Sequence, residues 1–104
     1  MAVCYISEYD KLARDEQGYL MAAGLEPSLA EQQVAIGAGS TQSSAFNAST
    51  RIVRVHTDAI CHIAIGTNPT ASTATKRLAA NQTEFFGVQA HGAGSQKIAV
   101  IEGS

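Results

Sequence analysis

The second half of the chain alternates between short apolar runs and loops built from small polar residues. Within each run the side chains divide by parity, so that Val53 and Val55 fall on one face while Arg54 and His56 fall on the other. This period of two is typical of half-buried antiparallel strands, because successive side chains of a strand point to opposite faces of a sheet. The runs are RIVRVHT (51–57), ICHIAIG (60–66), TEFFGVQ (83–89) and QKIAVI (96–101).

The connections between these runs predict two hairpins. Only a few residues around Asp58 and Ala59 separate the first two runs, and the Gly-rich AHGAGS separates the last two. The residues of inward parity should form one core. They are Val53, Val55, Ile63, Ile65, Val88 and one of the pairs Ile98/Val100 or Ala99/Ile101.

The segments around the predicted hairpins also favour β structure. AEQQVAI (30–36) predicts a strand, and the low-charge linker 37–50 has room for a short one near 44–46. The long loop 67–82 carries Leu78, which we expect to close one end of the core. Six or seven short strands separated by turn signals predict an all-β fold, either a β-sandwich or a jelly-roll-like barrel.

The N-terminal part is less regular than the rest. We expect residues 1–29 to form an arm and residues 30–104 to form the β-sandwich domain. In the arm, AVCYIS (2–7) predicts a short strand, whereas residues 9–27 have weak helical spacing. Gly18 interrupts that spacing, and a Gly inside a helix costs about 1 kcal/mol relative to Ala. One helical turn and an irregular loop therefore both remain open for this segment.

Composition and charge remove several classes of function. The chain has 104 residues, which suits one domain, and 15% of them are charged against a typical share of about 25%. The formal net charge of −2 provides no basic field for nucleic acid. Residues 1–31 hold six acidic and two basic side chains, whereas the remainder has a basic excess. This asymmetry arises either by chance or because an acidic N-terminal part docks on a neighbouring subunit.

Targeting signals and cysteines point to a protein made in the cytoplasm. No segment reaches the roughly 18 to 20 apolar residues that span a bilayer, so we expect no membrane association. The opening MAVCYISEYD lacks the basic and apolar regions of a signal peptide. Cys4 and Cys61 fit this compartment as small buried hydrophobic residues, although their spacing leaves a disulfide open.

The residues that often carry chemistry do not assemble into a recognisable site. His56 and His62 have the parity to share one face of a hairpin, but a zinc site needs three or four ligands, and only Asp58 and Cys61 are near. We therefore interpret the histidines as a solvent-facing or interface pair. His91 is interpreted as a solvated residue of a Gly-rich loop.

Motifs for catalysis and phosphate binding are also missing. The chain has no GxSxG turn, and the Gly-rich 37–41 lacks the lysine of a phosphate-binding loop. Asp15 and Glu16 are adjacent and point in different directions, so they form no acid–base pair. We predict that the protein is not an enzyme and that it has no catalytic, cofactor or metal site.

One resemblance suggests a role. The runs STRIVRVHTDAICHIAIGTNPTAS and AANQTEFFGVQAHGAGSQKIAVI resemble small β-structured proteins encoded in the virion gene clusters of tailed bacteriophages and prophages. The shared features are an Arg-Val strand, an IAIG–NPTA strand and loop, a double-aromatic strand and a terminal KIAVI strand. The resemblance covers roughly the last half of the chain, and the opening ISEY…EPSLAEQQVAI fits more loosely. It implies a structural virion protein, foremost a capsid decoration (cement) protein on the surface of the head.

This resemblance implies a partner and an interface, but no residue of the interface follows from it directly. The partners would be the major capsid protein, further copies of the chain, or both. Tyrosine, methionine and leucine in the N-terminal part are apolar enough to bury against such a partner, since aromatic residues and Met are enriched at interfaces. The alternative is that these side chains cover an open end of the sandwich. The candidate contacts are Tyr5, Tyr9, Leu12, Tyr19, Leu20 and Met21.

Two other functions remain as alternatives. The protein could be a tail, neck or fibre component of the virion, which the sequence does not separate from a head protein. It could instead be a small ligand-binding β-module, such as one for carbohydrate. Such modules usually expose aromatic platforms, and we expect Phe46, Phe85 and Phe86 to be taken up mostly by the core.

Overall fold

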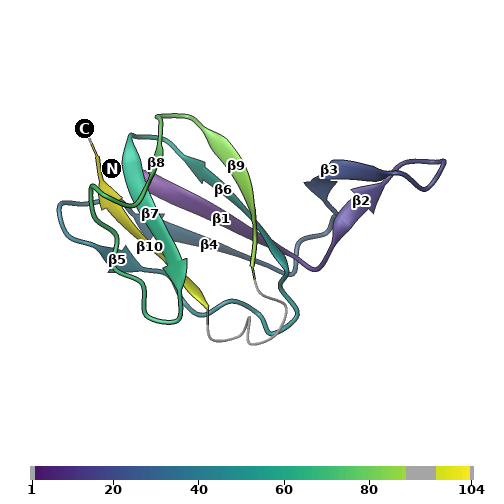
Figure 1. Cartoon of the computed structure of the whole chain (residues 1–104), viewed down its shortest axis with the longest axis horizontal. Coiled ribbons are helices and arrows are strands. Elements are labelled where there is room, and N and C mark those ends of the chain that lie inside the picture. Colours follow the sequence, from purple (N-terminus) through teal and green to yellow (C-terminus); the bar gives the residue numbers. More distant parts are fainter. Residues whose placement is uncertain (1, 89–95, 104) are drawn as a thin grey trace.

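The computed structural model describes residues 2–88 and 96–103, and all regular structure in these ranges is β-strand. The strands are β1 (Val3–Tyr9), β2 (Leu12–Arg14), β3 (Leu20–Gly24), β4 (Ala30–Ala35), β5 (Thr41–Gln42), β6 (Ile52–Thr57), β7 (Cys61–Gly66), β8 (Lys76–Leu78), β9 (Thr83–Gly87) and β10 (Lys97–Glu102). Two antiparallel sheets pack against each other (Figure 1). The first sheet has the order β4-β1-β6-β9 and the second β5-β10-β7-β8. The predicted all-β sandwich is confirmed.

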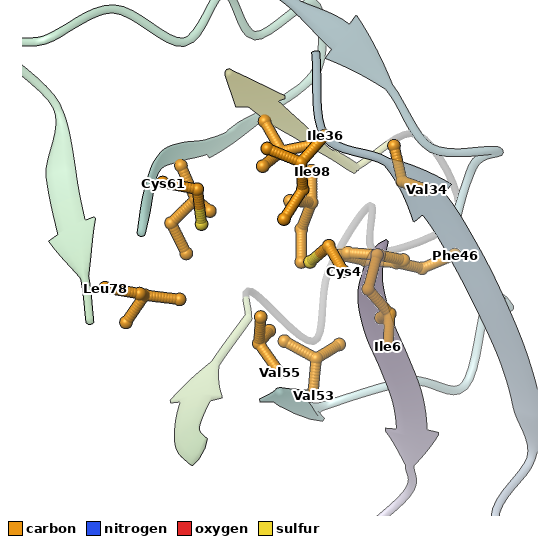
Figure 2. Packing of buried hydrophobic residues seen from close by; sticks show 12 residues of the cluster. Cys4, Ile6, Val34, Ile36, Phe46, Val53, Val55, Cys61, Leu78 and Ile98 are labelled. Carbon is orange, nitrogen blue, oxygen red and sulfur yellow. The ribbon is translucent and has the colours of Figure 1, made fainter. Parts of the chain in front are cut away.

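The core lies between the two sheets and draws on both of them. Figure 2 shows Val53 and Val55 near Cys4 and Ile6, all from the first sheet. Ile98 and Cys61 belong to the second sheet and pack in the same core. The prediction from parity is confirmed, with Ile98/Val100 as the inward pair of β10. Fully buried are Val53, Val55, Ile63, Ile98 and Val100, and Ile65 and Val88 pack against them at the edge.

The two predicted hairpins are wrong, because the strands of each one lie in different sheets. β6 pairs with β1 and β9, whereas β7 pairs with β10 and β8. β9 and β10 are divided in the same way between the first and second sheets. The connection at 58–60 thus crosses the sandwich, and its Asp58 Oδ1 accepts a hydrogen bond of 2.7 Å from the backbone of Val3. Inward parity looks the same whether two strands are neighbours or face each other across a core.

The predicted arm of residues 1–29 also needs correction. β1 is a central strand, since Ile6 has Gln32 of β4 on one side and Val55 of β6 on the other. Only the segment after Tyr9 leaves the sandwich, and it is a hairpin of β2 and β3 rather than a helical turn. The seven residues of β1 therefore belong to the folded domain, which also contains β4 to β10.

The linkers hold two short edge strands. The short strand of the first linker is β5 at Thr41–Gln42, three residues before the predicted position. Phe46, which follows it, is buried in the core. The long loop contains β8, and its Leu78 is buried at the end of the core as predicted.

A buried carboxylate ties the first sheet to the loop that follows β5. The side chain of Glu8 on β1 is only 1% exposed. Its Oε1 accepts hydrogen bonds from the Asn47 backbone N–H (2.7 Å) and the Thr50 hydroxyl (2.8 Å), and its Oε2 accepts one from Gln32 Nε2 (3.0 Å). A buried charge requires such partners, because its removal from water is costly. The Glu8 side chain therefore stabilises the fold by these hydrogen bonds.

Candidate functional site

The hairpin of β2 and β3 is closed by a turn, in a segment whose sequence has weak helical spacing. Asp15 Oδ1 accepts hydrogen bonds from the backbone N–H groups of Gln17 (2.9 Å) and Tyr19 (3.0 Å). Gly18 has a φ of 85°, in the left-handed region that glycine adopts without strain, and Arg14 donates to its carbonyl. The glycine that would have broken a helix instead makes the turn. An Asp three residues before a Gly was the signal available in the sequence.

This projecting hairpin exposes a group of apolar side chains. Tyr19 is 71% exposed, Leu20 60% and Met21 46%, and Leu25 at its base is also exposed. Figure 1 shows the hairpin extending from one end of the sandwich, with no other strand beside it. A two-stranded hairpin is marginally stable by itself in water. Its apolar side chains therefore lie where a partner can cover them.

The base of the hairpin packs on the sandwich through Tyr9. Gly24 lies directly against the Tyr9 ring, where a Cβ atom would overlap the ring carbons. The Tyr9 hydroxyl donates a hydrogen bond of 2.7 Å to Glu26 Oε2. Burial, followed by the hydrogen bond to this carboxylate, raises the pKa of Tyr9. The hairpin is thus joined to the first sheet at a defined point.

The six predicted contact residues divide between three places. Tyr19, Leu20 and Met21 follow one another on the hairpin and are exposed, and Leu12 on β2 is half-buried. Tyr9 is buried at the hairpin base, so it positions the hairpin. Tyr5 is exposed on the outer face of the first sheet, with its ring centroid 6.2 Å from that of His56. These last two placements follow from β1 being a central strand.

A cleft of about 450 Å³ lies where the hairpin base meets the outer face of the first sheet. Ser7 and Arg54 come from the central strands β1 and β6, Glu31 from β4 and Phe85 from β9, while Glu26 belongs to the hairpin base. The predicted use of Phe85 in the core is wrong: it is 39% exposed on the outer face, whereas Phe46 is buried in the core and Phe86 packs against it. The outward parity of Arg54 was visible in the sequence, but its neighbours depended on strand pairing.

Hydrogen bonds within the chain hold the cleft carboxylates in place. The Glu31 carboxylate accepts from the Ser28 hydroxyl at Oε2 (3.0 Å) and from the Ser7 hydroxyl at Oε1 (3.4 Å). Glu26 accepts from Tyr9 at Oε2. Each carboxylate keeps further lone pairs, since an ionised carboxylate has about four acceptor positions.

The two histidines do not form a pair. His56 lies on the outer face of the first sheet, where its Nδ1 is 2.7 Å from the Thr83 hydroxyl. His62 lies on the outer side of the second sheet and is buried, with Nδ1 donating to the Thr75 carbonyl at 3.0 Å. The shared face expected for them is therefore wrong, because β6 and β7 belong to different sheets. His91 lies outside the described residues.

Both cysteines are free and buried in the core. Burial, with smaller effects from Cys61 and Asp58, raises the pKa of the Cys4 thiol to about 12. Burial also raises the pKa of Cys61. A thiol of this kind is inert, because the thiolate is the reactive form.

The described residues hold neither a metal-binding group nor a membrane-spanning helix. Across 2–88 and 96–103, no three His, Cys, Asp or Glu side chains gather as metal ligands. No helix in those ranges has the length and apolar character needed to cross a bilayer.

Comparisons with known proteins add no relatives. No family model matches the chain, and no curated protein or solved structure matches it significantly.

Proposed function

We propose that this protein is a structural component of a bacteriophage virion, a capsid decoration protein that docks on neighbouring capsid subunits through its projecting hairpin. The observation that carries the proposal is the exposure of Tyr19, Leu20 and Met21 on a hairpin outside the sandwich. The resemblance of the second half of the chain to phage virion proteins supplies the setting. The protein would be made in the host cytoplasm and reside on the capsid surface.

The energetics of the hairpin favour a docking role over a covering role. Fully burying a Leu or Met side chain contributes about 1.5 to 3 kcal/mol, and this gain is unrealised while these side chains face water. If the hairpin covered an open end of the sandwich, its apolar side chains would be buried already. Exposed apolar side chains on a hairpin that projects from the domain instead offer contacts to another protein.

The charge around the hairpin indicates the kind of capsid surface that would accept it. Residues 10–26 hold four acidic side chains against two basic ones. A basic or neutral surface with an apolar groove would accept this acidic segment, whereas an acidic surface would repel it.

Copies of the chain are proposed as additional partners. The first sheet ends in β4 and β9, and edge strands present unpaired backbone groups that can pair with another chain. β4 carries one charged residue, Glu31, and β9 carries one, Glu84, so these edges are weakly protected. A homo-oligomer formed at one of these edges would leave the hairpin free for the capsid.

The test is binding to empty heads assembled from the major capsid protein of the phage or prophage genome that carries this gene. The double variant Leu20→Ser/Met21→Ser should lose binding and heat stabilisation of the heads. The matched control is Lys76→Ser/Arg77→Ser, which changes two exposed residues of β8 at the other end of the molecule (Figure 1). Removing residues 1–27 is unsuitable, because that deletion would remove β1.

Two results would contradict this proposal. Full occupancy of heads by the Leu20/Met21 variant would show that these hairpin residues do not contribute to the interface with the capsid. Binding of the wild-type protein to purified tails in place of heads would assign it to the tail, neck or fibre.

A further inference from the structure

The cleft beside the hairpin base is lined by polar and aromatic side chains that the proposed capsid docking does not use. Glu31, Ser7, Arg54 and Phe85 are direct cross-strand partners and form one row across β4, β1, β6 and β9. Neighbouring strands lie about 4.8 Å apart, so this row spans roughly 14 Å of the outer face. Acceptors stand at one end, a guanidinium lies near the middle and an aromatic ring stands at the other end.

Arg54 is the least expected member of this row. It is half-buried on a central strand, yet among the described residues the ion pair of the structure is Arg51 with Asp10 (3.2 Å), and Arg54 has no carboxylate at such a distance. A guanidinium presents five N–H donors in a planar fork. Arg54 lines the cleft, so its donors can reach a molecule bound there.

The two carboxylates supply the complementary acceptors. Hydroxyl groups of the chain donate to Glu31 and Glu26, and these carboxylates keep further lone pairs for other donors. Their orientation is therefore set before any ligand arrives, which lowers the cost of binding.

Phe85 adds an apolar surface at the end of the row. Its ring is 39% exposed, and its centroid lies 6.4 Å from that of Tyr9, with the planes tilted by 42°. The ring contributes to the wall of the cleft rather than to the core. A ligand with an apolar face would cover it.

We propose that this cleft binds a neutral saccharide. Sugar hydroxyls both donate and accept, so they suit carboxylates and a guanidinium in one site, while the C–H face of a sugar ring can stack on Phe85. The two carboxylates would repel an anionic ligand, and Arg54 would repel a cationic one. The volume of about 450 Å³ falls within the range of small-molecule sites.

This inference is independent of capsid docking. The cleft is lined at the hairpin base by Ala23, Gly24 and Glu26, whereas the proposed capsid contacts lie further along the hairpin. Variants in the cleft and variants at Leu20 and Met21 therefore test different functions.

The test is a titration of isotope-labelled full-length protein, followed by NMR, with neutral hexoses, N-acetylhexosamines and their di- and trisaccharides at millimolar concentrations. At least one sugar should shift the amide signals of Ser7, Arg54 and Phe85 in a saturable way. Phe85→Ala should weaken binding about fivefold or more. Arg54→Met should weaken it about tenfold or more, because a hydrogen bond to a charged group is lost.

Controls separate specific binding from loss of the fold. Lys76→Ala lies on the second sheet and should bind as the wild type does, and Phe85→Tyr should retain binding. Each variant must keep the wild-type melting temperature to be counted. Glucuronic acid and arginine, tested at the same concentrations, serve as anionic and cationic probes.

Three outcomes would overturn the proposal. One is the absence of saturable shifts at the cleft with every neutral sugar. Another is binding of arginine or glucuronic acid alone, which would assign the cleft to a charged ligand. The third is sugar binding that survives both Phe85→Ala and Arg54→Met, which would place the site elsewhere.

Discussion

The Tyr9 ring lies so close to Gly24 that a Cβ atom there would overlap the ring, and this contact joins the projecting hairpin to the sandwich. Tyr9 ends a central strand of the first sheet, and Gly24 ends the returning strand of the hairpin. The Tyr9 hydroxyl then reaches Glu26 just beyond. One aromatic side chain therefore sets the position of the proposed capsid contacts and forms part of the wall of the cleft.

Gly24→Ala should destabilise the protein by about 1 to 3 kcal/mol, because its new methyl group must displace the Tyr9 ring. Urea unfolding monitored by tyrosine fluorescence would measure the change. Gly39→Ala is the matched control, since a Cβ there meets no atom within 4 Å. Equal stabilities of the two variants would contradict the contact.

Glu8→Ala should cost about 3 kcal/mol, because it leaves the buried hydroxyl of Thr50 and the N–H of Asn47 without their acceptor. Chemical denaturation gives the free energy of unfolding directly. Glu84→Ala removes an exposed carboxylate from β9 and should stay within about 0.5 kcal/mol of the wild type. A Glu8 variant as stable as the Glu84 variant would show that the buried network is dispensable.

Ile63→Ala should cost about 2 to 5 kcal/mol, the usual range for truncating a fully buried Ile, because it opens a cavity between the two sheets. Leu20→Ala is the comparison, since Leu20 is exposed on the hairpin and its truncation should have little effect on unfolding. Thermal and urea unfolding of both variants would check this. A small loss at Ile63 would mean that β7 does not face the core.

The Cys4 thiol should make the protein less stable in alkali. Its folded pKa of about 12 lies above the ordinary 9.0, so the unfolded chain releases the thiol proton at lower pH. This contribution to stability is complete below pH 9 and is lost as pH rises toward 12, at roughly 1.4 kcal/mol per pH unit.

The measurement is urea unfolding at a series of pH values above neutrality. Cys4→Val should weaken the alkaline decline, while Cys61 and Tyr9, whose pKa values are also raised, retain part of it. Native Cys4 and Cys61 should also resist a thiol reagent at neutral pH and react after unfolding. An identical pH dependence in the Cys4 variant would contradict the assignment.

Some of the molecule followed from local pattern alone. Alternation along 51–57 and 60–66 was enough to identify which side chains point inward, because the two faces of a strand are set by backbone geometry. The strand at 30–36 and the burial of Leu78 followed from similar local signals. The candidate contacts Tyr19, Leu20 and Met21 were chosen from their residue types, and the structure places them on an exposed hairpin.

Strand partners required the tertiary structure. A hairpin between β6 and β7 and a crossing between sheets bury the same side chains, so Val55 and Ile63 gave no information about which one forms. The hairpin of β2 and β3 was missed because weak helical spacing competed with the Asp15–Gly18 turn, and only long-range packing against Tyr9 decides between them.

The sequence by itself determined the all-β class, the inward faces and the apolar character of the N-terminal part, because each depends on neighbours along the chain. Only the tertiary structure decided that β1 is central, that the histidines lie on different sheets, and that Arg54 stands between Ser7 and Phe85. Those relationships depend on which strands pair, and pairing is settled by packing the whole core at once rather than by any single segment.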